Sequence, residues 1–426
     1  MKKDKNPKWR KLDNTAKLFP VMANKHRTNV YRVAVVMKED IDGAVLSQAV
    51  NEILPWFEAF TVRLRKGFFW PYFEDNNRPV LVTEEDTWPC QYIDPKAGDR
   101  YLFRVTYYKK RINLEISHAI TDGLGAINFL KELAYCYLDI KNGRTFKPNG
   151  AGIPSSDCYH ALEDSYIKNY KELAAKSYSK ENAFQVKGER LPYGITNVMH
   201  GHLDNAGMKR ICKEKNASTT QILATMLIYT IYQEYWANSK DNHAIALNIP
   251  VNLRNFFDSE TTMNFFAVTN IRFQPGKEEA VFDVILSEVK KQMAEKITKE
   301  RMEELISYNV GYEKKLTRYV PLFIKEIGTK LIYSFSEKSY TMTLSNLGKI
   351  QVLPEYEEEI ESFYALMGVG KQQPLKCTVV TYKNNIVVTI ASVFETTYLQ
   401  KGFFRLARKL GMNVKLESNG VHDETM

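Results

Sequence analysis

The stretch that decides the fold is Ile116-Ser-His-Ala-Ile-Thr-Asp-Gly-Leu-Gly125, because it places an imidazole, His118, and a carboxylate, Asp122, at one turn. The preceding residues, Arg111–Ser117, alternate apolar and polar side chains, as is typical of a half-buried strand. After the turn, apolar residues recur at helical spacing, and Asp122 or the threonine before it suits the N-cap position. The sequence therefore predicts a histidine at the end of a strand, directly before a helix.

This position suits a general base, which needs a neutral imidazole with a ring nitrogen free to accept a proton. The partial positive charge of the helix N-terminus would disfavour protonation of His118. The role of Asp122 stays open, because its carboxylate could orient His118, cap the helix or pair with an arginine. Gly123 would permit close backbone packing. An ordinary loop histidine followed by a capping aspartate is the alternative explanation of the motif.

The motif His118-x-x-x-Asp122-Gly123 resembles the signature of the chloramphenicol-acetyltransferase-like superfamily. This superfamily includes alcohol acyltransferases, plant acyl-CoA-dependent acyltransferases, wax ester synthases and nonribosomal peptide condensation domains. Ile249-Pro-Val-Asn-Leu-Arg254 is similar to the family's strand that carries an arginine partner for the motif aspartate. Thr343-Leu-Ser-Asn-Leu-Gly348 is similar to its Ser-Asn segment. The three segments follow the family's order, and the resemblance spans about residues 17–410.

The resemblance implies an α+β fold of two chloramphenicol-acetyltransferase-like lobes, each a mixed sheet with helices, with a channel between them. A strand followed by an amphipathic helix begins both halves of the chain, near residues 29–53 and 198–212, which agrees with two similar lobes. We expect an N-terminal lobe at 1–175, a linker at 176–195 and a C-terminal lobe at 196–426. Because two-lobe members of the family build the channel within one chain, a functional monomer is expected.

The resemblance also implies transfer of an acyl group from a thioester to an alcohol or amine, as in an alcohol O-acetyltransferase. Acyl-CoA is the expected donor, so that a coenzyme A thioester is a cosubstrate and no cofactor is bound; an acyl carrier protein is the alternative donor. His118 would be the base, Ser345 or, second, Asn346 would stabilise the developing oxyanion, and Arg254 would brace Asp122.

Each of these assignments has a simpler alternative. Ser345-Asn346 also fits a strand end entering a turn, and Arg254 also fits an exposed strand end. The whole chain could be a non-catalytic member of the fold that binds an acyl group or a partner. The chain lacks the Asp-Phe-Gly-Trp-Gly segment of the plant branch and the full Ser-Asn-Val-Pro-Gly-Pro pattern of wax ester synthases, which puts a long-chain lipid acceptor in doubt.

Composition restricts the remaining possibilities. The five cysteines are widely spaced and form no C-x-x-C pair, which favours a reduced cytoplasm. No secretory signal and no membrane-spanning segment is expected. The net charge of +9 fits a solvated surface, attraction to an anionic cosubstrate or nucleic-acid binding; the scattered basic residues argue against nucleic acid. His200 and His202 lack the further ligands that a metal site needs, so no metal is expected.

Overall fold

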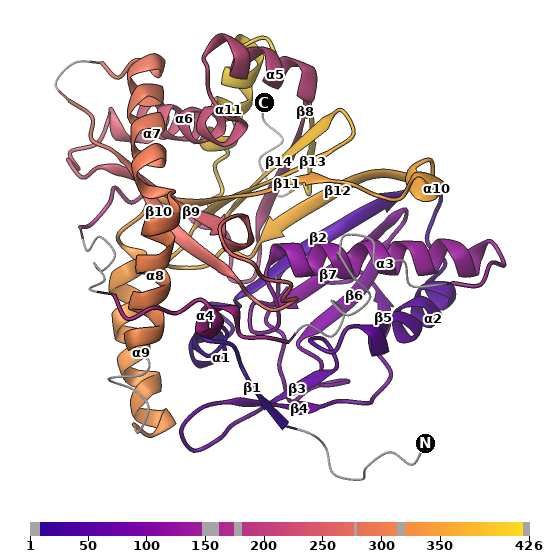
Figure 1. The fold of residues 1–426 in the computed structure, drawn as a ribbon. Helices are drawn as coiled ribbons and strands as arrows, with labels where there is room; N and C mark the ends of the chain where they lie inside the picture. The colour runs from indigo at the N-terminus through magenta and orange to yellow at the C-terminus, as the bar shows by residue number, and fades with distance from the viewer. Residues whose placement is uncertain (1–8, 147–161, 174–180, 277–278, 313–319, 421–426) are drawn as a thin grey trace.

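Two mixed β-sheets dominate the computed structural model, which describes residues 9–146, 162–173, 181–276, 279–312 and 320–420 (Figure 1). The first sheet has the strand order β12-β2-β7-β6-β5. Its strands are β2 (Val30–Met37), β5 (Val82–Glu84), β6 (Phe103–Tyr108), β7 (Arg111–Ser117) and β12 (Ile360–Met367). Helices α2 (Gly43–Ile53) and α3 (Gly123–Lys141) pack on one face of this sheet.

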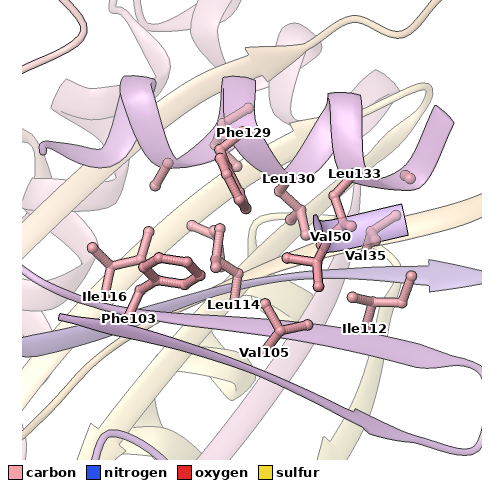
Figure 2. Close-up of a cluster of buried hydrophobic side chains, with 14 of the residues drawn as sticks. Val35, Val50, Phe103, Val105, Ile112, Leu114, Ile116, Phe129, Leu130 and Leu133 are labelled. Carbon is pink, nitrogen blue, oxygen red and sulfur yellow. The ribbon is translucent and has the colours of Figure 1, made fainter. Parts of the chain in front are cut away.

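The alternation in β7 produces the core beneath α3. Ile112, Leu114 and Ile116 are fully buried, and they lie opposite Phe129 and Leu130 of α3 (Figure 2). The apolar face of the helix and the apolar face of the strand therefore cover one another, as the two periodicities predicted. The expectation of a half-buried strand is wrong, because Asn113 and Glu115 on the other face of β7 are also buried.

The second sheet has the order β10-β9-β11-β13-β14-β8-β15. Its strands are β8 (Asn197–Asp204), β9 (Ile245–Asn252), β10 (Phe266–Phe273), β11 (Met342–Ile350), β13 (Leu375–Tyr382), β14 (Asn385–Ser392) and β15 (Val414–Ser418). A separate hydrophobic core joins this sheet to α5 (Asn205–Glu214), α6 (Thr219–Ile231), α7 (Phe282–Lys296) and α11 (Tyr398–Lys409). Two sheets with their own helices confirm the predicted α+β class and the two-lobe architecture.

The smaller elements lie around these lobes. A three-stranded sheet contains β1 (Trp9–Lys11), β3 (Val62–Arg65) and β4 (Tyr72–Asp75). The remaining helices are α1 (Leu18–Met22), α4 (Ser165–Lys168), α8 (Lys299–Tyr312), α9 (Leu322–Glu337) and α10 (Pro354–Glu357), and short helical turns occupy Leu54–Trp56, Tyr232–Trp236 and Leu253–Asn255. In the described ranges, no helix combines the length and the apolar character that crossing a bilayer requires.

One strand crosses the division between the lobes that the sequence suggested. β12 follows residue 196 in the chain, yet it pairs along its length with β2 of the first sheet. A boundary that assigns 1–175 to one lobe and 196–426 to the other therefore does not separate the two sheets. Such an exchange is invisible in the sequence, because a strand's own pattern does not identify the sheet that it joins.

The face of the second sheet that lies opposite its helices is directed toward the first lobe. Along β13, Leu375, Cys377 and Val379 belong to the second core, whereas Val380 and Tyr382 belong to the first. The Tyr382 ring meets Phe363 of β12 with ring centroids 5.1 Å apart. Because successive side chains of a strand point to opposite faces, the even-numbered positions of β13 look toward the first lobe.

Candidate active site

His118 lies directly after β7, enclosed by aromatic side chains from both lobes. Its backbone N–H donates to Asn29 O at 3.0 Å, which extends the pairing of β7 with β2. Its ring stacks on Phe19 with centroids 5.0 Å apart, lies 4.3 Å from the Tyr31 ring and 6.2 Å from the ring of Phe266 in β10. The imidazole is therefore partly buried in a largely aromatic environment.

Burial keeps this imidazole neutral. The pKa of His118 is lowered to about 4, first by burial and next by the positive charge of Lys376, while the Asp122 carboxylate opposes the shift. Nδ1 is buried and has no hydrogen-bond partner among the described residues. The sequence pointed to the helix N-terminus as the cause of a neutral ring, whereas the structure gives burial as the largest cause.

The turn that carries His118 is held from both lobes. Tyr31 Oη donates to Thr121 O at 3.1 Å and to Asp122 O at 2.9 Å. From the second lobe, Asn264 Nδ2 donates to His118 O at 3.0 Å. The Thr121 hydroxyl donates a hydrogen bond to the backbone carbonyl of Thr262 at 2.6 Å. The backbone on each side of the imidazole is thus fixed by buried contacts.

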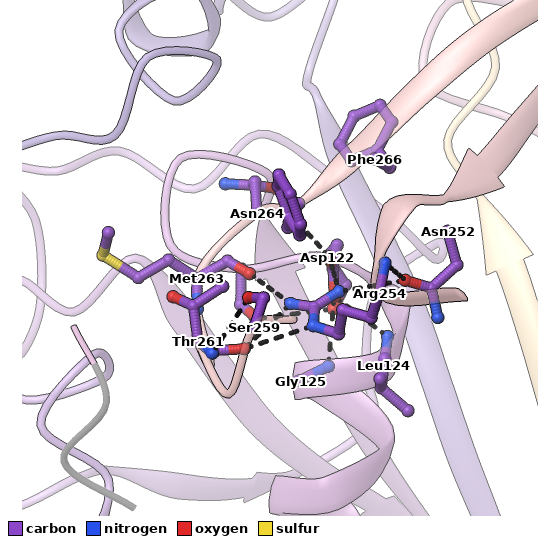
Figure 3. Close-up of polar contacts among 12 residues, drawn as sticks. Asp122, Leu124, Gly125, Asn252, Arg254, Ser259, Thr261, Met263, Asn264 and Phe266 are labelled. Atoms are coloured by element: carbon purple, nitrogen blue, oxygen red, sulfur yellow. Dashed lines mark hydrogen bonds and ion pairs between the residues drawn. The ribbon is translucent and has the colours of Figure 1, made fainter. Parts of the chain in front are cut away.

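The Asp122 carboxylate is directed to the helix and to the second lobe (Figure 3). Oδ1 accepts from the N–H groups of Leu124 and Gly125, each at 3.2 Å, which caps α3. Oδ2 accepts from Arg254 Nη1 at 2.7 Å and from the Phe265 N–H at 2.9 Å. Of the roles left open, the structure shows capping and pairing with arginine. No hydrogen bond joins this carboxylate to His118 in the described residues, so the catalytic grouping of Asp122 stays a prediction.

Arg254, in the short turn after β9, has all parts of its guanidinium engaged. Besides Asp122, it donates through Nη2 to the carbonyls of Thr261 at 2.9 Å and Met263 at 2.7 Å. The side chains of Arg254 and Asp122 are 11% and 9% exposed, so the ion pair is buried. The alternative of an exposed arginine at a strand end is wrong.

Gly123 and the Ser-Asn segment meet through Leu347. A Cβ atom on Gly123 would lie 2.5 Å from Leu347 Cδ2, so a side chain there would force the Leu347 side chain of β11 to move. In β11, Met342 and Leu344 pack in the second core, so that Ser345, like Leu347, points to the opposite face, toward the first lobe.

Ser345 and Asn346 differ in what their side chains do. The Asn346 amide donates through Nδ2 to Thr220 Oγ1 at 3.0 Å and accepts through Oδ1 from the Gly348 N–H at 2.9 Å. Gly348 has a φ of +77°, and the register of β11 shifts after Asn346. The Ser345 hydroxyl makes no hydrogen bond with the described residues, so it is the available donor of the two.

Sequence reasoning did not find several groups that shape the site. Asn264, Tyr31 and Lys376 carry no motif: Tyr31 approaches His118 from the neighbouring strand β2, and Asn264 and Lys376 approach it from the second lobe. His200 and His202 of β8 also face the first sheet, with their rings 4.6 and 5.7 Å from the ring of Tyr364 in β12, and His200 Nδ1 contacts Thr389 Oγ1 at 2.8 Å. No group of three or more metal-ligating side chains occurs in the described part of the chain. Cys158, the one cysteine beside a histidine in the sequence, lies outside the described residues.

Comparison with solved structures identifies the fold. TRI101 of F. sporotrichioides, complexed with coenzyme A and T-2, has a TM-score of 0.66 at 10% identity, over 96% of this chain and 99% of that one. The first condensation domain of the calcium-dependent antibiotic synthetase, in complex with a substrate analogue, has a TM-score of 0.62 at 12% identity, over 95% of each chain. A mutant starter condensation domain of rhizomide synthetase, in complex with C8-CoA, has a TM-score of 0.57 at 12% identity, over 93% of this chain and 92% of that one.

The chain therefore has the chloramphenicol-acetyltransferase-like fold that its motif predicted, over nearly its whole length. The low identity means that these likenesses establish the fold alone. Neither a protein-family model nor a curated protein sequence matches the chain.

The contributions of Asp122 and Arg254, the ion pair between the lobes, to the free energy of unfolding should be coupled. Asp122→Asn and Arg254→Met should each lower the free energy of unfolding by about 3 kcal/mol, because each leaves a buried group without its partner. The double variant should lose less than the sum of the two, by about 1 kcal/mol or more. Urea unfolding of the four proteins measures the cycle. Lys38→Ala, which breaks the exposed pair with Glu358, is the control and should change stability by about 0.5 kcal/mol at most. Single variants that are as stable as that control would contradict a stabilising role for the ion pair between Asp122 and Arg254.

The titration of His118 should be displaced strongly to acid pH. Since the pKa in the folded state is about 4 and the ordinary value is 6.5, the ring should stay neutral at pH 5. The unfolded chain takes up this proton first, so the contribution of His118 to stability is complete above pH 6.5 and declines as the pH falls toward 4. Imidazole NMR shifts, assigned with His118→Gln, measure the titration. A midpoint near 6.5 would show that the ring is solvated.

Proposed function

We propose that this protein is an acyltransferase, which moves an acyl group from a thioester to an alcohol or amine with His118 as the general base. The observation that carries the proposal is a neutral imidazole with a buried, unpaired Nδ1, on a turn fixed by contacts from both lobes. A general base must be unprotonated and rigidly positioned, and this histidine is both.

Acyl-CoA is the donor that we favour. Two proteins of similar fold were solved with coenzyme A or C8-CoA, and a net charge of +9 would attract an anionic cosubstrate. The likeness to condensation domains supports a second candidate, an acyl group delivered on a carrier protein. Both donors present the same thioester to His118, so the site chemistry is common to them.

The reaction follows from the arrangement. His118 removes the proton of the acceptor hydroxyl or amine as that atom attacks the thioester carbonyl. The tetrahedral intermediate then collapses, the carbon–sulfur bond breaks, and the imidazolium returns the proton to the departing thiolate. The acceptor itself is the nucleophile, so no acyl-enzyme forms. Asp122 and Arg254 act by holding the turn, and they take no proton.

Ser345 is our candidate for stabilising the oxyanion. Its hydroxyl lies on the face of β11 that looks toward the first lobe and is not engaged by the described residues, whereas the amide of Asn346 is used by Thr220 and Gly348. A hydroxyl placed in advance where charge develops stabilises the transition state more than the ground state.

One chain supplies both sides of the site, which supports a functional monomer with an interlobe channel. Arg254, Asn264 and Phe266 come from the second lobe, and His118 and Tyr31 come from the first. We place the enzyme in the cytoplasm, because the four cysteines in the described residues are free thiols.

Substitution of His118 by alanine should reduce turnover about 10²- to 10⁴-fold, the usual contribution of a general base. The assay follows thiol release from acyl-CoAs of increasing length, and from the same acyl groups on a carrier protein, with mixed alcohol and amine acceptors. Release from carrier thioesters alone would select the carrier-dependent candidate.

The matched control is His200→Ala. His200 is also a partly buried histidine, with a pKa lowered to about 3 mainly by burial, but its Nδ1 is paired with Thr389. Melting temperatures of both variants separate lost folding from lost chemistry. Equal activity of folded His118→Ala and wild type would refute the role of His118 as the general base. If the wild type releases thiol from no donor, the result would point to a non-catalytic binding protein.

Replacement of Ser345 by alanine should lower kcat by about 10²-fold with little change in KM, because the hydroxyl acts on charge that exists only in the transition state. Ser345→Thr keeps a hydroxyl and should retain much of the activity. A larger effect on KM than on kcat would assign Ser345 to ground-state binding instead.

A further inference from the structure

Lys376, the second residue of strand β13, has no role in the chemistry derived so far. It occupies an even position of the strand, on the face that looks toward the first lobe, and in the register of the sheet it lies opposite Thr343 of β11. The next pair along the same face is Ser345 and Thr378. Lys376 therefore belongs to the polar strip of the second sheet that includes the candidate oxyanion donor.

The surroundings of Lys376 come from three distant segments. Arg27, just before β2, is hydrogen-bonded to Glu337 at the end of α9 and to Gln372 in the loop before β13. Gln373 Nε2 donates to Glu337 Oε1 at 3.0 Å. These contacts gather Arg27, Glu337 and Lys376 at the start of β13, and the charge of Lys376 acts on His118 from there.

The Lys376 ammonium is left without a bound partner. Within the described ranges it makes no hydrogen bond and no ion pair, although each ammonium can donate three hydrogen bonds. Burial lowers the pKa of Lys376 to about 8, against the opposing charge of Glu337. It is therefore mostly charged at pH 7.

The charges around it do not balance. Glu337 is the carboxylate that acts on Lys376 in the described residues, and it is already bonded to Arg27. One carboxylate thus faces two cations. Lys376 is partly buried, and a charge removed from much of its water without a partner is costly, so an anionic ligand at this position would be stabilised by it.

We propose that Lys376 binds a carboxylate of the reacting substrate, so that the enzyme prefers a carboxylated acyl group or a carboxylated acceptor. This inference rests on the proposed function and names its substrate class. A coenzyme A phosphate is a poor candidate for this partner, because the whole pantetheine arm separates it from the thioester that His118 must approach. An anion beside His118 belongs to the acyl group or to the acceptor.

Two matched pairs of probes distinguish these sources. Succinyl-CoA and butyryl-CoA differ in a terminal carboxylate on the acyl group; 4-hydroxybutyrate and 1-butanol differ in the same way on the acceptor. Turnover of each member is measured with the wild type, Lys376→Met and Lys371→Met, and calorimetry measures binding of each probe separately. Methionine preserves the length of the lysine without its charge and suits a buried position. Lys371 is exposed in the loop before the same strand, so it controls for the loss of one charge.

The proposal expects the wild type and Lys371→Met to prefer the carboxylated member of one pair by about tenfold or more, the usual value of a charge-assisted hydrogen bond. Lys376→Met should lose that preference, mainly through KM, so that its kcat/KM falls about tenfold or more further on the carboxylated member than on the neutral one. Absence of a preference in both pairs, or equal loss on neutral and carboxylated probes, would overturn it. If no donor is turned over, the proposed function fails, and the calorimetric preference alone decides whether Lys376 binds a carboxylate.

Discussion

The buried ion pair between Arg254 and Asp122 is the constraint on which the rest of the site depends. Removing two charges from water costs several kcal/mol per ion, so such a pair persists only when its other hydrogen bonds are also made. Here Asp122 accepts from four donors, and Arg254 reaches two backbone carbonyls of its own lobe. Because Asp122 also caps α3, one side chain fixes both the start of that helix and the approach of the second lobe.

Burial has a second consequence, for the strength of the base. A pKa of about 4 makes His118 neutral at pH 7, yet it also makes the free imidazole a weak proton acceptor. In the mechanism proposed above, the imidazolium becomes favourable only when negative charge develops near it, and that charge appears as the acceptor attacks the carbonyl. By this mechanism, the aromatic enclosure would disfavour protonation in the resting site and permit it in the transition state, which is where stabilisation raises kcat.

The sequence predicted those parts of the structure that local pattern controls. β7, the cap at Asp122 and α3 follow from alternation, capping chemistry and helical spacing, and the two-lobe fold follows from the motif's resemblance. The pairing of β12 with β2 and the approach of Asn264 to His118 could not be predicted, because both depend on contacts between segments far apart in the chain. The direction of the Asp122 carboxylate stayed open for the same reason, because it is set by the ion pair with Arg254, which lies more than a hundred residues away in the chain.

The location of the site follows from a change of character along one face of the second sheet. At Val380 and Tyr382 this face packs into the first lobe's core, and β12 seals the contact. Toward the start of β13 and along β11 the same face carries Lys376, Thr343 and Ser345, which cannot form such a core. The polar groups of such a strip, which lies between packed lobes, must form hydrogen bonds with other protein groups, with water or with a ligand. With His118 at this end, and Ser345 and Lys376 unpaired among the described residues, a ligand that brings an oxyanion and a second negative charge would satisfy both.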